Sequence, residues 1–225
     1  MSTTRDHLIV ALDVPTQKDA LNLVDQLADQ VGAFKIGLQL YTAEGPKIVR
    51  EVRARGGEVF LDLKLHDIPN TVAKAVEEAC RLDVKLLTLH TFGGREMLSR
   101  AAQTAADFRE REGRAPELLG VTVLTSLDQS SVEELGYRAP LQELVSTLAH
   151  LAAGAKIDGV VCSPLELERL QPEVGDRLFF VTPGIRPAGT SADDQRRVLT
   201  AGDAIRAGAR YLVVGRPITR ADSPL

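Results

Sequence analysis

Carboxylates and lysines occur inside segments that otherwise have the composition of buried strands. The segment EVFLDLKLHD (58–67) places Asp62 and Lys64 two residues apart in an apolar run. Two similar segments nearer the N-terminus, HLIVALDV (7–14) and AFKIGLQ (33–39), carry Asp13 and Lys35. A buried charge is costly unless an opposite charge lies next to it. Charges of alternating sign in such segments therefore indicate either buried ion pairs or a site that does chemistry.

Segments of this apolar kind recur along the whole chain, with helical patterns between them. We expect eight strands, within residues 7–14, 33–39, 58–65, 85–92, 118–126, 159–163, 177–184 and 211–216. The intervening segments repeat apolar residues at helical spacing, as at Val72, Val76, Ala79 and Cys80. Strands that alternate with helices predict a parallel sheet with right-handed crossovers.

Two α/β folds have this order of elements, an open doubly wound sheet and a closed eight-stranded barrel. No G-x-G-x-x-G motif follows the first strand, which argues weakly against a dinucleotide-binding sheet. Eight repeats without a linker favour a (β/α)8 TIM barrel that forms a single domain over residues 1–225. The sequence stops at ITRADSPL, so we expect the C-terminal outer helix of the barrel to be missing.

The alternation of side chains along a strand predicts where the four charges point. Asp62 and Lys64 fall on the face opposite to the leucines of their strand, which should pack against the helices. The same reasoning turns Lys35 and Asp13 toward the barrel interior, near the carboxyl ends of the strands, where barrel enzymes have their active sites. One Lys–Asp pair would suggest a buried ion pair, but four charges from three consecutive strands favour a catalytic network.

The ends of the seventh and eighth strands carry glycine and arginine. TPGIRP offers Gly184 and Arg186, and VGRP offers Gly215 and Arg216, where barrels often bind a phosphate group. The small polar segment AGTSADDQ (188–195) between them is a candidate lid. Taken together these residues favour a phosphorylated ligand, although each arginine alone would fit a solvated turn.

Two further strand ends carry polar side chains. VLTS after the fifth strand offers Thr125 and Ser126 as neutral hydrogen-bonding groups, with helix capping an equally good role for Ser126. For His90, at the end of the fourth strand, we expect an ordinary histidine whose hydrogen bonds are satisfied.

Composition excludes several classes of function. Asp and Glu (31) outnumber Lys and Arg (27), and the net charge of −4 gives no support for nucleic-acid binding. No run is long and apolar enough for a membrane span, and the start MSTTRDHLIV lacks the apolar region of a secretory signal. The two cysteines, Cys80 and Cys162, lie in apolar segments, and the four histidines lack metal-ligand spacing. We therefore expect a cytoplasmic protein that binds no metal.

A series of motifs closely resembles the orotidine 5′-phosphate decarboxylase family. DLKLHDIPNT occurs together with LD, FKIG, VLTS, TPGIRP, DDQRR and VVGRPIT, in an order that spans residues 7–222. The resemblance implies conversion of orotidine 5′-phosphate to uridine 5′-phosphate and carbon dioxide, the last step of de novo pyrimidine synthesis. It also implies that neither a metal nor an organic cofactor takes part.

The resemblance assigns roles to individual residues. Lys64 would donate a proton to C6 of the base, within a charged set that includes Lys35, Asp62 and Asp67. Asp13 and Lys35 would hold the ribose, Ser126 the pyrimidine edge, and the arginines the phosphate with Gln195 of the lid. The implied substrate contacts are Asp13, Lys35, Asp62, Thr71, Thr125, Ser126, Pro183, Arg186, Gln195, Gly215 and Arg216. The resemblance also implies a homodimer in which Asp67 and Thr71 reach into the partner's site.

Two alternatives remain open at this point. Related sugar-phosphate barrels, such as 3-keto-L-gulonate 6-phosphate decarboxylase and hexulose-phosphate synthase, share the D-x-K-x-x-D strand but use Mg²⁺. TPGIRP and VLTS argue against them. A non-catalytic nucleotide-binding barrel is the second alternative, but binding alone does not require a lysine at a reacting carbon.

Overall fold

Eight parallel strands form a closed barrel in the computed structural model, which describes residues 4–185, 199–221 and 223–224. Each strand pairs with the next in the sequence, and β8 pairs with β1. The expected barrel is therefore confirmed. Its strands are β1 (Leu8–Ala11), β2 (Ala33–Gly37), β3 (Val59–Leu65), β4 (Leu86–His90), β5 (Glu117–Val121), β6 (Gly159–Val161), β7 (Phe179–Thr182) and β8 (Ala209–Val214).

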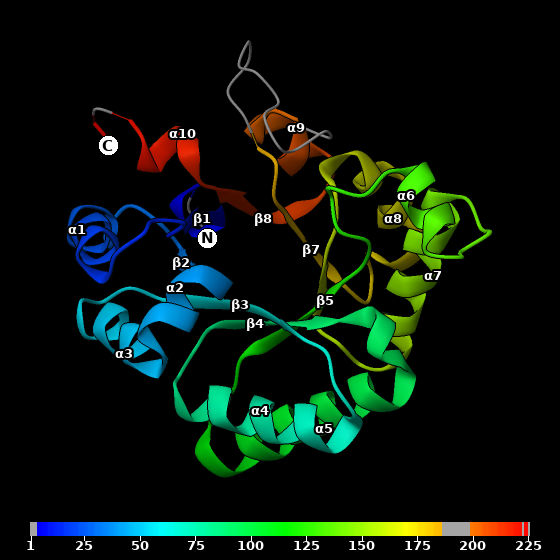
Figure 1. Cartoon of the computed structure of the whole chain (residues 1–225), viewed down its shortest axis with the longest axis horizontal. Coiled ribbons are helices and arrows are strands. Elements are labelled where there is room, and N and C mark those ends of the chain that lie inside the picture. Colours follow the sequence, from blue (N-terminus) through cyan, green and yellow to red (C-terminus); the bar gives the residue numbers. More distant parts are fainter. Residues whose placement is uncertain (1–3, 186–198, 222, 225) are drawn as a thin grey trace.

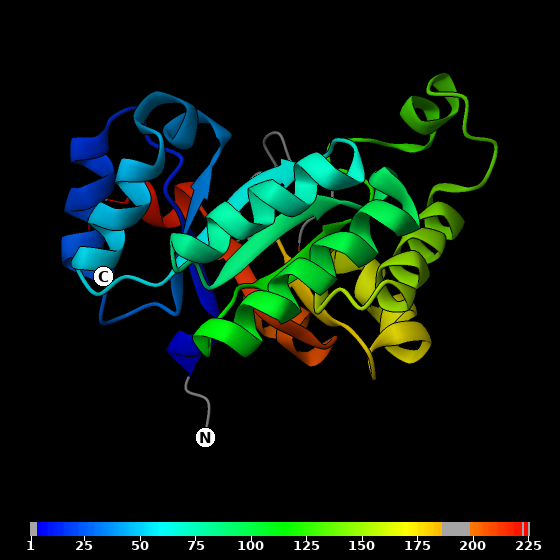
Figure 2. The ribbon, with the colours of Figure 1, turned by 90° about the horizontal axis from the view of Figure 1, so that it is seen from below.

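Helices surround the strands, as Figure 1 shows, and Figure 2 shows α4 and α5 running side by side along the outside of the barrel. The α-helices are α1 (Gln17–Leu27), α2 (Leu38–Glu44), α3 (Pro46–Ala54), α4 (Pro69–Arg81), α5 (Gly94–Glu112), α6 (Gln129–Glu134), α7 (Leu141–Gly154), α8 (Leu167–Val174), α9 (Ala201–Arg206) and α10 (Arg216–Thr219). Short 3-10 turns are η1 (Thr4–His7), η2 (Thr91–Gly93) and η3 (Pro164–Glu166). Among the described residues after β8, the chain forms the four-residue α10.

The strands divide the apolar side chains into two cores. One core fills the space between strands and helices, and it includes Val10, Phe34 and Leu61. The other fills the barrel interior, and its buried members are Ile9, Ala11, Ala33, Phe60, Leu86, Leu119, Val181, Tyr211 and Val213. Neighbouring strand residues such as Ile9 and Val10 thus fall into different cores, as strand alternation requires. The predicted stripe of α4, from Val72 to Cys80, is buried as expected.

Several strands are shorter at their carboxyl ends than the apolar pattern suggests. β1 ends at Ala11, so Asp13 lies in the loop after the strand. β5 ends at Val121, which leaves VLTS in a loop as well. These loops form the rim of the barrel, where backbone direction no longer follows the strands. In the part of the chain that is described, no helix is both long and apolar enough to cross a bilayer.

Candidate active site

A cavity of about 500 Å³ opens at the carboxyl ends of the strands. Its walls come from both ends of the chain, since residues after β1 and residues after β8 line it together. Ala11, Phe60, Val161 and Val213 line the cavity and also belong to the interior core of the barrel. The cavity therefore has an apolar floor, and the charged side chains stand above it.

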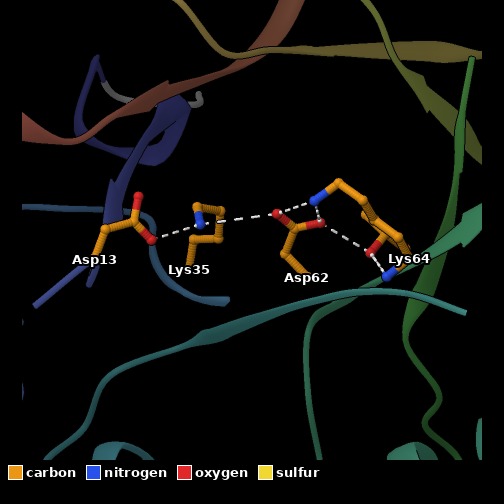
Figure 3. Close-up of polar contacts among 5 residues, drawn as sticks. Asp13, Lys35, Asp62 and Lys64 are labelled. Carbon is orange, nitrogen blue, oxygen red and sulfur yellow. Dashed lines mark hydrogen bonds and ion pairs between the residues drawn. The ribbon is translucent and has the colours of Figure 1, made fainter. Parts of the chain in front are cut away.

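The four charges predicted from strand alternation form one continuous row (Figure 3). Lys35 Nζ lies 3.0 Å from Asp13 Oδ1 and 3.8 Å from Asp62 Oδ2. Lys64 Nζ donates to both carboxylate oxygens of Asp62, at 2.9 Å each. Side-chain exposure is 13% for both Lys35 and Asp62, 30% for Lys64 and 59% for Asp13. Alternating signs allow these charges to lie close together in a partly dehydrated site, and the central pair is the most enclosed.

Gly37 provides the space for this row at the end of β2. A Cβ atom there would stand 3.0 Å from Lys35 Nζ and 3.4 Å from Asp13 Oδ1. A larger side chain would push the Lys35 ammonium away from its carboxylate. The glycine of the FKIG motif is thus explained by the ion pair that it faces.

β3 departs from regular strand geometry where the charges lie. Its register with β4 runs from Leu61 opposite Leu87 to Leu65 opposite Leu89, with an irregularity between them. Three residues of β3 therefore lie opposite one residue of β4. Lys64 itself has φ of +51°, a left-handed conformation that is unfavourable for residues other than glycine. The expected strand is present, and Asp62 and Lys64 do line the cavity, but the strand is irregular at these residues.

Thr88 of β4, which the sequence reading missed, occupies the position opposite this irregularity. Its hydroxyl accepts a hydrogen bond from the backbone N–H of Lys64 at 2.9 Å and donates one to Asp62 Oδ1 at 3.0 Å. Thr88 is completely buried. A polar side chain among the leucines of KLLTLH, at an inward-facing position, is the sequence signal that could have identified it.

The rest of the cavity lining includes neutral and cationic groups. Thr125, Pro183, Gly215 and Arg216 line it as expected, whereas Ser126 is exposed and does not. Arg220, at the end of α10, also lines the cavity and was not predicted. Two further predicted residues, Arg186 and Gln195, lie outside the described residues.

The charge of the described lining favours an anionic ligand. Four cationic side chains face two carboxylates, and these are Lys35, Lys64, Arg216 and Arg220 against Asp13 and Asp62. Gly184 also lines the cavity, with φ of +80°, a backbone conformation suited to glycine. Across the described ranges, no three His, Cys, Asp or Glu side chains are grouped as ligands of a metal ion. The described lining thus carries more positive than negative side chains.

Asp67 and Thr71 do not line the cavity of their own chain. Both are exposed, and Asp67 Oδ1 accepts a hydrogen bond from the N–H of Ile68 at 2.6 Å. Ile68 itself is 66% exposed. The segment that leads from β3 into α4 thus presents a carboxylate, a hydroxyl and a large apolar side chain to the outside.

His90 does not have the satisfied hydrogen bonds that we expected. Its Nδ1 atom is buried and has no hydrogen-bond partner within the described part of the chain. The ring lies between His66 and Phe92, with centroids 5.5 and 5.3 Å away. Burial lowers the pKa of His90, and the charges of His66 and Lys64 lower it further. The imidazole is therefore kept neutral beside the charged row.

Comparison with known proteins gives the same assignment over nearly the whole chain. The family model described as "Orotidine 5'-phosphate decarboxylase / HUMPS family" matches residues 6–225. The orotidine 5′-phosphate decarboxylase of Syntrophotalea carbinolica is 49% identical over 98% of this chain and 91% of its own length. The enzyme of that name from Opitutus terrae is 50% identical over 97% of this chain and 93% of its own.

Solved structures agree with the sequence comparison. The crystal structure of orotidine 5′-phosphate decarboxylase from Lactobacillus acidophilus superposes with a TM-score of 0.85 at 35% identity, covering 96% of this chain and 93% of that one. An uncharacterized conserved protein from Geobacillus kaustophilus gives a TM-score of 0.85 at 36% identity, covering 96% and 94%. On both its motifs and its full-length matches, the chain belongs to the orotidine 5′-phosphate decarboxylase / HUMPS family.

Proposed function

We propose that this chain is an orotidine 5′-phosphate decarboxylase, a carboxy-lyase that forms uridine 5′-phosphate and carbon dioxide in the last step of pyrimidine biosynthesis. The observation that carries the proposal is the row Asp13–Lys35–Asp62–Lys64, which faces a cavity that Arg216 also lines. A site with a fixed ammonium at one side and an arginine at another suits a nucleotide whose reacting carbon and phosphate are far apart.

Lys64 carries the chemical step in this proposal. When the bond from C6 to the carboxylate breaks, its electron pair stays on C6 in the plane of the ring, where the π system cannot delocalise it. A preorganised cation next to C6 stabilises that charge as it develops. The Lys64 ammonium then gives a proton to C6, so uridine 5′-phosphate forms and the neutral amine regains its proton from solvent.

Asp62 and Lys35 hold Lys64 in place. Asp62 binds the Lys64 ammonium through both oxygens, which fixes where the cation lies before the substrate arrives. Lys35 links Asp62 to Asp13 and offsets the repulsion between the two carboxylates. We assign the ribose hydroxyls to Asp13 and Lys35. A carboxylate at Asp62 also lies on the side where the substrate carboxylate departs, and it would repel that group in the ground state.

The remaining contacts bind the ends of the nucleotide. We assign the pyrimidine edge to Thr125, which lines the cavity, while Ser126 would need a movement of its loop to reach the base. We assign the phosphate to Arg216 and the backbone around Gly215, with Pro183 lining the cavity at the end of the neighbouring β7. Arg186 and Gln195 complete this group by family resemblance. Binding energy from the phosphate contributes to lowering the barrier at C6.

The proposed reaction uses no metal ion and no organic cofactor, which separates it from the Mg²⁺-dependent sugar-phosphate enzymes. The test is the loss of orotidine 5′-phosphate absorbance with purified protein and excess chelator. Full activity in chelator supports the proposal. No turnover of this substrate, or activity that returns only with Mg²⁺, would favour the sugar-phosphate alternative, and ligand binding without turnover would favour a binding protein.

The thiols support a reducing compartment, and we place the enzyme in the cytoplasm. Cys80 and Cys162 are both buried. Burial raises the pKa of the Cys80 thiol to about 11, so it remains protonated and unreactive at neutral pH. Cysteines of this kind are typical of proteins that never form disulfides.

We further propose that the active unit is a homodimer in which each chain completes its partner's site. Asp67 and Thr71 are exposed and do not line their own cavity, and the neighbouring Ile68 offers an apolar contact. A two-fold axis would bring both segments to the opposite cavities reciprocally. Asp67 then extends the row of charges beyond Lys64.

Mixing two inactive variants tests the shared site. In a heterodimer of Lys64→Ala and Asp67→Ala chains, one site carries both defects and the other carries neither. Random exchange makes about half of the dimers mixed, so about a quarter of all sites should be active. If Asp67 serves its own chain, every site keeps one defect, and the mixture stays inactive after verified subunit exchange.

A further inference from the structure

We propose that Thr88 is a positioning residue for the decarboxylation, holding Lys64 in the left-handed backbone conformation from which its ammonium reaches the reacting carbon. The inference rests on the proposed role of Lys64. Thr88 does not line the cavity, so it acts on the substrate only through Asp62 and Lys64.

The backbone around Lys64 needs an outside restraint. Between the pairs Leu61–Leu87 and Leu65–Leu89, β3 has two more residues than β4, so the regular ladder is interrupted beside Lys64. Its φ of +51° is a conformation that persists in a side-chain-bearing residue only where the surroundings enforce it. In place of a ladder partner, the backbone N–H of Lys64 donates to the Thr88 hydroxyl.

The chemistry of the groups fixes the direction of both hydrogen bonds. A backbone N–H can only donate, so the Thr88 oxygen accepts from Lys64 and its single proton is left for Asp62 Oδ1. Asp62 in turn accepts from the Lys64 ammonium. Both ends of Lys64, its backbone amide and its Nζ, are therefore tied to one carboxylate through a closed ring of bonds.

Burial makes this ring sensitive to the loss of one hydroxyl. Thr88 is 0% exposed, so water does not replace its oxygen at no cost. A β-branched side chain also has few χ1 rotamers in a strand, which keeps the hydroxyl between its two partners. Without it, the Lys64 amide lacks an acceptor and Asp62 is free to turn, and the ammonium shifts away from C6.

The experiment compares Thr88→Val, which keeps the shape and removes the hydroxyl, with Thr88→Ser, which keeps the hydroxyl. A displacement of a catalytic group by about 1 Å costs about 10²-fold in rate. We therefore expect Thr88→Val to lower kcat by roughly 10–100-fold, with the Kd for uridine 5′-phosphate within about threefold of wild type. Thr88→Ser should restore kcat to within about threefold.

Thr91→Val is the matched control. Thr91 is also completely buried, and its hydroxyl donates to the carbonyl of Val121 at 2.6 Å and not to a member of the charged row. Its loss should lower the melting temperature but leave kcat unchanged. Equal losses of kcat in the Thr88 and Thr91 variants would overturn the proposal, because they would show a general effect of removing a buried hydroxyl. If Thr88→Val does not fold, Thr88→Ala serves in its place.

A crystal structure of the Thr88→Val variant separates this proposal from the proposed function. We expect Lys64 to leave φ near +51° or its Nζ to lose one oxygen of Asp62. An unchanged Lys64 overturns the positioning role, whatever the enzyme's activity. A wild-type protein inactive toward orotidine 5′-phosphate would instead refute the proposed function, while a displaced Lys64 would still establish that Thr88 holds it.

Discussion

The two ends of the barrel both contain charged side chains, but they use them differently. At the amino ends of the strands, Arg210 lies over the rings of Phe179 and Tyr211, at 4.4 and 5.2 Å from the centroids. It also pairs with Glu117 at 3.1 Å. Lys85 lies 5.5 Å from the Tyr211 ring centroid and donates to the carbonyl of Gly32 at 3.2 Å. These cations close the barrel by packing against aromatic rings and bonding to fixed acceptors.

At the carboxyl ends, the cations face an open cavity instead. Lys64 keeps a strained backbone, and Lys35 lies between two carboxylates that repel each other. We infer that the charged side chains at the amino end stabilise the fold, whereas those at the carboxyl end line the cavity at some cost in backbone strain. Substitutions at the two ends should therefore separate activity from stability.

Lys64→Ala should give the largest effect, a loss of kcat of about 10⁴-fold or more, because one substitution removes both the cation and the proton donor. Thermal unfolding should remain cooperative, and uridine 5′-phosphate should still bind.

The Lys64→Gly variant tests whether the backbone of Lys64 is strained. Glycine adopts φ of +51° without strain, so this inactive variant should be more stable than Lys64→Ala by about 1–2 kcal/mol in denaturant unfolding. Turnover within tenfold of wild type would remove Lys64 from its role.

Arg216→Ala should lower kcat/KM for orotidine 5′-phosphate by about 10²-fold or more, since the phosphate loses its charged partner. The nucleoside orotidine, which has no phosphate, is the control. Steady-state kinetics on both substrates should show a loss on the nucleotide alone. Equal losses on both would indicate that Arg216 supports the fold of the rim.

Tyr211→Ala should damage the other end of the barrel. Truncating a buried aromatic residue costs about 3–5 kcal/mol of unfolding free energy, and Tyr211 is 5% exposed. Denaturant unfolding measures this loss, and kcat per folded molecule should remain near that of wild type. Tyr211→Phe keeps the ring under Arg210 and Lys85, and it should cost no more than about 1 kcal/mol. A fall in kcat with full stability would contradict the division between the two ends.

The smallest effect concerns pH and His90. Because its pKa is lowered in the folded state, the unfolded chain binds this proton more readily. The free energy of unfolding should therefore be highest above the ordinary pKa of 6.5 and fall as the pH decreases through the folded-state value. His90→Asn should flatten this part of the stability profile. An identical slope in the wild-type and variant proteins would contradict the burial of a neutral imidazole.

The strand order and the row of charges were predictable because both depend on simple periodicities. Strand alternation placed Asp62 and Lys35 inward, and their neighbours Leu61 and Ile36 are indeed buried in the outer core. The choice between Thr125 and Ser126 was not predictable in this way. β5 ends at Val121, and beyond that point the direction of a side chain no longer follows from its position in the sequence.

The irregularity of β3 could not be predicted either. LDLKL alternates perfectly, and nothing in it marks the left-handed conformation of Lys64. That conformation depends on the register with β4 and on a hydroxyl 24 positions away, at Thr88. Cross-strand register is a tertiary property, so local sequence patterns did not reveal the backbone conformation of Lys64.

The apolar residues beneath the cavity limit where ligands can enter and leave the barrel. Phe60, Leu119 and Val181 fill the barrel below the cavity and are at most 2% exposed, so among the described residues no channel runs through to the amino end. We therefore expect the nucleotide substrate and the nucleotide product to enter and leave on the same side of the barrel, at the carboxyl ends of the strands. Because both would occupy one cavity, we expect uridine 5′-phosphate to compete with its precursor for binding.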